Sequence, residues 1–346
     1  MSIQTYETSQ RIGIQKGEIL AHAGIQEVLG IAGEQKRMKR KMGDTVKYRR
    51  FLPFGGSTAN AKTINQWVVD PNDHLTQEGI TPDADTITPQ DVSVTINQYS
   101  CLYVYTDKAN DLHEDDWPQA QKEQTGERIG LVREMVRYGV LKGCSNKFYA
   151  GGTSRASVDK TVSKALLRKI TRSLTGNGAR MVTSVLAASP NYATSPIEAA
   201  FLVFCHTDME HDIRELEGFK HVSEYGSRKP VHEDELGSCD RYRFIVSRHL
   251  TPMPSAGAAV GATGLISSDD ANIDVYPLIV VAKDAWADLA LRGGDSFDPT
   301  HIPVGQKTKD DPHGQRGYVG AIFWDAAFIQ NDGHMAVAEC GATELG

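Results

Sequence analysis

The chain has 346 residues, of which 23% are charged, and a net charge of -7. That charge excludes a globally basic nucleic-acid-binding protein but does not exclude a local basic patch. The longest strongly apolar run, residues 278–282, is far shorter than the ~20 residues that a membrane-spanning helix needs. The first residues lack the charged and then apolar pattern of a secretion signal, so we expect neither export nor a membrane partner.

The five cysteines are scattered, odd in number and never spaced as C-x-x-C: Cys101, Cys144, Cys205, Cys239 and Cys340. A disulfide framework or a cysteine zinc site would need paired spacing, so we expect free thiols buried in a protein made in a reducing cytoplasm. At roughly 150 residues per domain, the length favours two compact units, or one unit with long appendages.

The N-terminal 50 residues have the character of an arm. From Gly13 to Ala32, the spacing of apolar residues predicts a partly apolar helix. A basic run follows: Lys36, Arg37, Lys39, Arg40 and Lys41. This density of positive charge suits DNA phosphates or acidic loops of another subunit, and it equally suits a solvated helix end. Residues 45–52 then predict a β-strand that ends at Pro53.

Residues 54–91 show little periodicity, which is uncommon for so long a stretch inside a compact domain. Residues 63–107 contain no Lys or Arg, while their acidic residues are Asp70, Asp73, Glu78, Asp83, Asp85, Asp91 and Asp107. Such a segment repels itself, and cations from another surface would steady it. The alternative is an acidic loop that is simply solvated.

The strongest predicted helix begins near Asp115 and Asp116, which can cap it, and ends before Gly143. An apolar stripe runs along it at residues 129, 132, 136 and 140, and its length is roughly 40 Å at 1.5 Å per residue. Before it, alternation over residues 91–105 predicts a strand or strand pair.

Further elements are predicted in the second half of the chain. We expect a helix over residues 163–174, buried strands over 200–205, 241–247 and 275–283, and a C-terminal hairpin of strands 318–329 and 335–340 around Asn331-Asp332-Gly333. Residues 255–268 predict a Gly/Ala-rich loop.

Two sequence motifs could in principle form a metal-binding or a phosphate-binding site. His206 and His211 flank a Thr207-x-x-Glu210 sequence that could bind metal, but we interpret this sequence as a helix-capping box. The glycines at 257, 261 and 264 match no phosphate-binding spacing. We therefore predict no catalytic, metal or cofactor site. An enzyme remains the alternative, and a pocket with convergent titratable groups would favour it.

Several short segments, taken in order from Gly43 to Glu339, resemble the major capsid proteins of tailed phages, in the group typified by coliphage N4. They are residues 43–53, 91–99, 106–109, 148–152 with Ser154-Arg155, 195–200, 218–219, 224–230 and Gln315-Arg316-Gly317 with Gly320. Each segment is short, and the order of all of them together carries the resemblance.

The resemblance implies the Hong Kong 97-like capsid fold, a mixed α/β (α+β) subunit. It implies an N-arm at residues 1–49, an extended E-loop at 50–95 and a P-domain with a spine helix at 96–183. An A-domain would occupy 184–315, and a C-terminal hairpin at 316–346 would return to the P-domain. The subunit would be structural rather than enzymatic, assembled in the host bacterial cytoplasm and located in the virion.

The implied partners are further copies in hexamers and pentamers, a separate scaffolding protein, a portal protein, an optional decoration protein and packaged double-stranded DNA bound non-specifically. As inter-subunit contacts we expect the cations Arg49, Arg50, Arg228 and Lys229 and the acids Glu78, Asp83 and Asp85. The basic run from Lys36 to Lys41 would contact DNA or a neighbouring subunit. A decoration or scaffolding protein is the alternative structural role.

Overall fold

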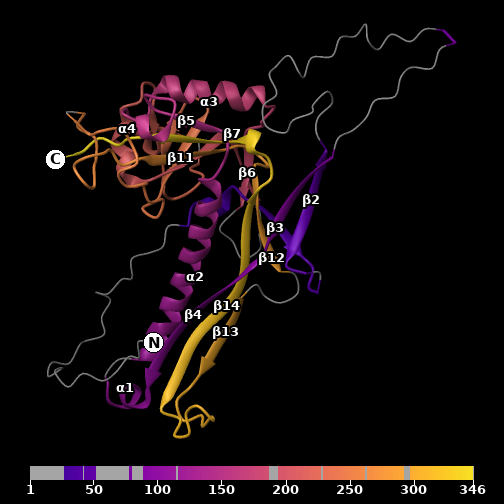
Figure 1. Cartoon of the computed structure of the whole chain (residues 1–346), viewed down its shortest axis with the longest axis vertical. Coiled ribbons are helices and arrows are strands. Elements are labelled where there is room, and N and C mark those ends of the chain that lie inside the picture. The colour runs from indigo at the N-terminus through magenta and orange to yellow at the C-terminus, as the bar shows by residue number, and fades with distance from the viewer. Residues whose placement is uncertain are drawn as a thin grey trace.

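The computed structural model describes residues 27–41, 43–51, 78–79, 89–113, 116–186, 194–226, 229–261, 263–291 and 297–345. Figure 1 shows helix α2 (Trp117–Leu141) running lengthwise from an upper body to a lower extension. Helices α3 (Lys164–Gly176) and α4 (Glu210–Arg214) belong to the upper body, and α1 (Asp107–Leu112) lies at the far end of the extension. In the described part of the chain, no helix is long and apolar enough to cross a membrane.

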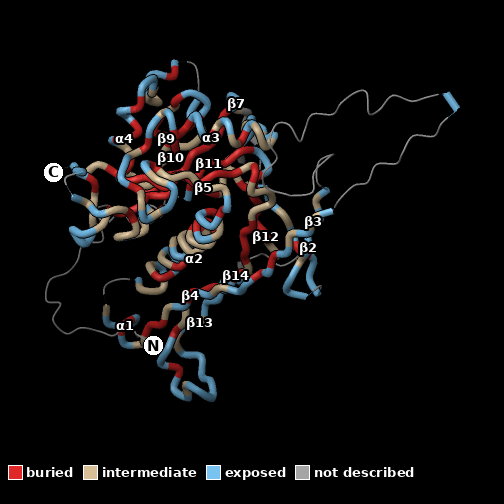
Figure 2. The backbone as a smooth tube through the Cα atoms, turned by 45° about the horizontal axis from the view of Figure 1, so that its top comes forward, coloured by how far each residue is buried: buried red, intermediate tan, exposed pale blue. Residues whose placement is uncertain are grey.

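The upper body is built on an eight-stranded sheet in the order β5-β15-β11-β7-β10-β9-β8, with β6 paired to β7. The strands are β5 (Lys147–Tyr149), β6 (Val182–Leu186), β7 (Thr194–Cys205), β8 (Lys220–His221), β9 (Glu235–Cys239), β10 (Tyr242–Val246), β11 (Tyr276–Val281) and β15 (Met335–Cys340). Figure 2 shows that buried residues concentrate in this body.

Alternation along β7 sends side chains into two separate cores. Phe201 and Val203 pack in one core with Leu167 and Ile170 of α3. Leu202 and Phe204, on the other face, share a core with the C-terminal part of α2 and with residues 28–29. The sheet is therefore covered on both faces, which explains why the strand predicted at residues 200–205 is uniformly apolar.

The lower extension holds a five-stranded sheet of β1 (Glu34–Met38), β4 (Asn97–Thr106), β12 (Trp286–Leu291), β13 (Phe297–Ile302) and β14 (Arg316–Ile329). β14 pairs with β4 along residues 316–325 and with β13 along 318–323. On α2, Ile129 packs against Cys101 and Phe323 of this sheet. A separate antiparallel ribbon joins β2 (Thr45–Phe51) to β3 (Pro89–Thr95).

Most predicted elements are confirmed. Strands form at residues 45–51, 89–95, 97–106, 242–246 and 276–281, and helices form at 117–141 and 164–176. The side chains of Asp116 and Ser163 accept hydrogen bonds from the backbone N–H groups of Gln119 and Leu166, as expected of N-caps. Along the expected stripe of α2, however, only Ile129 is buried, and Val132, Val136 and Val140 are half-buried.

The predicted C-terminal hairpin is wrong, although both of its strands exist. β14 pairs with β12, whereas β15 pairs with β11 in the other sheet. The residues between them form a 3-10 turn, Asp332–His334, and the Ala285 carbonyl accepts hydrogen bonds from the backbone N–H groups of Gln330 and Asn331. β11–β12 and β14–β15 therefore cross together from one sheet to the other.

Two local interpretations near the ends of helices are also wrong. The basic run does not end a helix, because Glu34–Met38 forms strand β1, parallel to β12. The proposed capping box is replaced by a cap from His206, whose Nδ1 accepts the Asp208 backbone N–H at 3.2 Å before a 3-10 turn at Thr207–Met209. Of the helix expected at residues 13–32, only the 3-10 turn Leu29–Ile31 lies in the described residues.

We predict that Gly33→Ala destabilises the fold by about 1–3 kcal/mol, as overpacking does. A Cβ at Gly33 would lie 2.6 Å from the ring of Trp286, which is fully buried. The matched control is Gly126→Ala on α2, where a Cβ meets nothing within 4 Å and alanine should stabilise the helix by about 0.5–1 kcal/mol. Urea unfolding of both variants measures the difference, and equal midpoints would contradict this packing argument.

Candidate assembly surfaces and the buried charge cluster

The interior face of α2 carries charge. Glu134 and Arg137 are 0% and 4% exposed, although they lie near the middle of the helix. Residues 130, 134, 137 and 141 follow helical spacing and share one face. The buried charge cluster consists of these two residues with Arg133 on α2, Asp288 on β12 and Asp325 on β14.

Arg137 is the centre of the cluster. Its Nη2 lies 2.8 Å from Oδ2 of Asp288, and its Nε donates to the same carboxylate at 3.0 Å. Its Nη1 lies 3.6 Å from Oε2 of Glu134. This geometry uses the fork of the guanidinium, which a lysine could not reproduce. The arginine therefore joins the long helix to the five-stranded sheet.

Glu134 fixes the chain at residues 28 and 29. Its Oε1 accepts hydrogen bonds from the backbone N–H groups of Val28 and Leu29 at 3.0 and 2.9 Å. Both of these residues are fully buried. A Cβ at Gly30 would lie 2.8 Å from Nη1 of Arg137, so the glycine allows close approach to the cluster. With β1 paired to β12, residues 28–38 are held at two successive points.

The cluster contains three carboxyl groups and two guanidinium groups. Burial raises the pKa of Glu134 and of Asp325 above their ordinary values. Burial alone would lower the pKa of Arg137, but the nearby carboxylate of Asp288 outweighs it and leaves that pKa raised. The arginine therefore stays charged.

The residues of the basic run from Lys36 to Lys41 differ in their exposure to solvent. Lys36 is half-buried, with its Nζ 2.7 Å from Oε1 of Gln330 and 4.9 Å from the centre of the Tyr48 ring. The other four cations are exposed: Arg37, Lys39, Arg40 and Lys41. Lys36 therefore serves the internal packing of the arm, and the exposed four provide the basic surface that phosphate or acidic contacts need.

The ribbon of β2 and β3 engages two predicted contact residues within the chain. Arg49 and Asp91, opposite each other, form a two-bond ion pair at 2.7 and 3.0 Å, and this hydrogen bonding lowers the pKa of Asp91. Arg50 donates to the side chain of Gln90 at 2.7 Å and to the Gln330 carbonyl at 3.0 Å. Glu78 and Lys229 are exposed, whereas Asp83, Asp85 and Arg228 lie outside the described residues.

The sequence did contain a signal for the buried charge cluster. Asp288 is the only charged residue of β12, and Asp325 is the only acid of β14. An isolated acid in a buried strand requires a partner. Glu134 and Arg137 share the helical face that includes Leu141. The apolar stripe of α2 alone does not predict this charged face of the helix.

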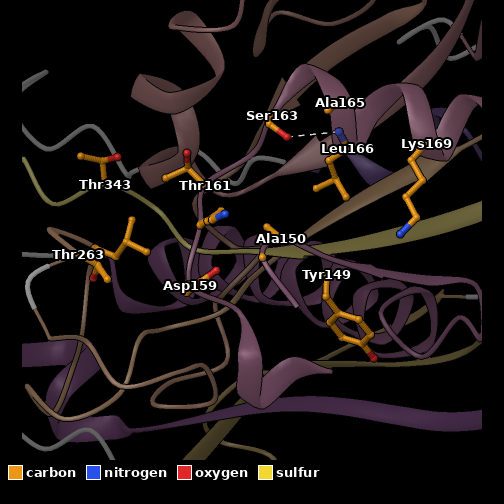
Figure 3. A pocket seen from close by; sticks show the side chains of 13 residues that line it. Tyr149, Ala150, Asp159, Thr161, Ser163, Ala165, Leu166, Lys169, Thr263 and Thr343 are labelled. Carbon is orange, nitrogen blue, oxygen red and sulfur yellow. Dashed lines mark hydrogen bonds between the residues drawn. The ribbon is translucent and has the colours of Figure 1, made fainter. Parts of the chain in front are cut away.

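A recess of about 580 Å³ lies beside the start of α3 (Figure 3). The Ser163 hydroxyl in it accepts the Leu166 backbone N–H, so this hydroxyl is occupied by helix capping. Asp159 and Lys169, which also line the recess, are exposed to solvent. Water screens such groups, and the recess has the character of a solvated surface.

Comparison with known proteins gave matches in structure alone. No family model matches the chain, and no curated protein matches it in sequence. The capsid subunit of Ralstonia phage GP4 is 12% identical with a TM-score of 0.60, and the alignment covers 98% of this chain and 100% of that one. The capsid asymmetric unit of cyanophage Pam1 is 13% identical with a TM-score of 0.56 and 99% coverage of both chains.

A third match, to Mycobacterium phage Che8, is 12% identical with a TM-score of 0.56 and covers 96% of this chain and 98% of that one. At these identities the likeness shows the fold. The chain has the mixed α/β Hong Kong 97-like capsid fold, with a long helix between two sheets, as the sequence predicted.

Proposed function

We propose that this chain is the major capsid protein of a tailed double-stranded DNA phage, which assembles into the hexamers and pentamers of an icosahedral head. One observation carries the proposal. The chain matches phage capsid subunits over nearly its whole length and over nearly the whole length of those subunits. In this role the protein is structural, not catalytic, and resides in the virion.

The parts of the subunit are proposed to follow the capsid plan. Residues 1–49 act as the N-arm, 50–95 as the E-loop, 96–183 and 316–346 as the P-domain, and 184–315 as the A-domain. Two features support this plan. The β2–β3 ribbon forms a paired base for the segment between them, and residues 28–38 are anchored on α2 and β12.

The finer resemblance to the coliphage N4 group is also a proposal. It is supported by the order of the short segments, several of which lie at structurally demanding positions. At Gly320, for example, a Cβ would lie 2.5 Å from the Cys101 carbonyl oxygen of β4.

The proposed contacts include partners as well as copies of the chain. A separate scaffolding protein, a portal protein, an optional decoration protein and the packaged DNA complete the set. Exposed Arg37, Lys39, Arg40 and Lys41 are proposed to contact DNA or a neighbour, with Lys36 contributing through its position in β1. For subunit contacts we propose Arg49, Arg50, Arg228 and Lys229 with Glu78, Asp83 and Asp85.

Assembly tests the proposal directly. Expressed with its scaffolding protein, the chain is expected to form closed shells of uniform size, visible by negative-stain electron microscopy, and capsomers without it in size-exclusion chromatography. Many weak contacts repeated around a closed shell give this stability. A stable monomer or trimer under both conditions would instead indicate a decoration protein.

A further inference from the structure

The outward face of α3 is strongly basic. The inner face buries Leu166, Leu167, Ile170 and Leu174. Facing away from this core are Lys164, Arg168, Lys169 and Arg172, and the helix contains no acidic residue. Figure 1 shows α3 along the outer edge of the upper body. The helix therefore presents concentrated positive charge on a chain whose net charge is -7.

Three arginines on this side form what we call the arginine surface: Arg168 and Arg172 of α3, and Arg241 at the turn between β9 and β10. They line a recess of about 590 Å³ with Thr171, Thr175, Gly176 and Asp240. Arg168 and Arg172 are four residues apart, so their side chains are neighbours on the helix. The turn is tight, because Asp240 adopts a positive φ of 54° and brings Arg241 beside them.

Stability of the subunit does not explain this arrangement. Like charges four residues apart destabilise a helix, and cations near its first turn oppose the helix dipole. The ion pair of Arg168 with Asp240 is 3.8 Å long, and its side chains are 68% and 49% exposed, so it contributes little. Guanidinium forks in a recess are suited to carboxylates brought by a partner.

The matching acidic surface is present in the same sequence. Residues 63–107 carry no cation, and five of their acids lie between positions 70 and 85: Asp70, Asp73, Glu78, Asp83 and Asp85. Arg49 is already paired with Asp91, and Arg50 with Gln90 and the Gln330 carbonyl. Arg49 and Arg50 are thus engaged within the chain, whereas Lys47 of the same ribbon is exposed.

We propose that the arginine surface of α3 receives the acidic segment 70–85 of a second copy of the chain. This inference rests on the proposed function, because it assigns one interface of the shell. A second copy fits better than DNA, since Asp240 lies within the arginine surface and Glu217 lies 3.6 Å from the nearby Lys164. These acids would repel phosphates, whereas the segregated charges of two copies complement each other.

A charge-swap experiment tests the interface. The double variant Arg168→Glu/Arg172→Glu, expressed with the scaffolding protein, is expected to lower the yield of closed shells by about ten-fold or more, since a repeated contact becomes repulsive. Adding Asp83→Lys/Asp85→Lys to the same chain is expected to restore most of the yield. Arg168→Lys/Arg172→Lys, which keeps the charge but loses the fork, should give an intermediate yield.

The controls separate folding from contact. Lys307→Glu/Lys309→Glu reverses two exposed charges in the loop before β14 and is expected to leave the yield unchanged. Urea unfolding of each purified subunit checks that the fold is intact. A shell yield restored by Asp83→Lys/Asp85→Lys would also show that the doubly reversed chain still folds.

Each remaining outcome counts against the interface. Unchanged shell yield in the double reversal, while the parent chain assembles, would overturn the interface and leave the proposed function standing. Normal shells with less packaged DNA would assign the arginine surface to DNA instead. Loss of yield without rescue by the acid reversals would assign it to another partner. If the parent chain forms no shells, the proposed function fails and this inference fails with it.

Discussion

Replacing Arg137 by methionine is expected to lower the free energy of unfolding of the subunit by about 3–5 kcal/mol. Arg137 is the cation in contact with both Asp288 and Glu134, whose side chains are 1% and 0% exposed. Methionine fills much of the same space, so the loss comes from charge rather than from a cavity. Two carboxyl groups would then be buried without their counterion, which costs far more than losing a surface pair.

Urea unfolding followed by tryptophan fluorescence measures this loss as a lower midpoint at unchanged slope. Lys122→Met is the matched control, because Lys122 is exposed on the same helix, and its effect should stay within about 0.5 kcal/mol. A triple variant that also carries Glu134→Gln and Asp288→Asn should recover much of the stability, since the uncompensated charges are gone. A small effect of Arg137→Met alone would show that the cluster is not the joint between helix and sheet.

Glu134→Ala is expected to release the arm at residues 28–38. The backbone N–H groups of Val28 and Leu29 would lose their acceptor while remaining in a buried site, at a cost of about 1–3 kcal/mol. Amide hydrogen exchange of these two residues should therefore accelerate by about ten- to a hundred-fold. Amides in the middle of β11 should keep their exchange rates, because that strand lies between β7 and β15.

Glu134→Gln separates the hydrogen bonds from the charge. The amide keeps the Oε1 acceptor, so the arm should stay protected. The pKa of Glu134 is raised by burial above its ordinary value of 4.5. The native state therefore holds this proton more tightly than the unfolded chain does, and the penalty of ionisation is absent below pH 4.5 and grows as the pH rises through the raised pKa.

Consequently, the Gln variant should match the parent protein near pH 4 and become progressively more stable than it as the pH rises towards neutrality. Unfolding midpoints at a series of pH values measure the trend. An advantage that shrinks with rising pH would mean that Glu134 is ionised in the native state at low pH, and the sign of its pKa shift would be wrong.

The elements predicted best are those whose local signals agree with their tertiary environment. α2 has a cap at Asp116 and a proline in its first turn, and β7 has an uninterrupted apolar run, so spacing and propensity point to the same structure. The two strands at residues 89–95 and 97–106 follow likewise from alternation, although they pair in different sheets.

The errors arose where distant segments decide the outcome. β1 is a basic pentapeptide with little strand propensity, and it is a strand because β12 offers a parallel edge and Met38 a buried contact. The Asn331-Asp332-Gly333 turn does not form a hairpin, because β14 pairs with β12 and β15 pairs with β11 instead of with each other. The charge cluster joins residues as far apart as 133 and 325, which no local window can bring together.

The paired crossing of β11–β12 with β14–β15 has a mechanical consequence. β11 and β15 pair in the eight-stranded sheet, and the strands that follow and precede them, β12 and β14, pair in the five-stranded sheet. A tensile load between the upper body and the lower extension would then be carried by both connections together, because the two strands that leave each sheet are hydrogen-bonded neighbours. A subunit with this construction resists separation of its two sheets at two adjacent connections rather than at one.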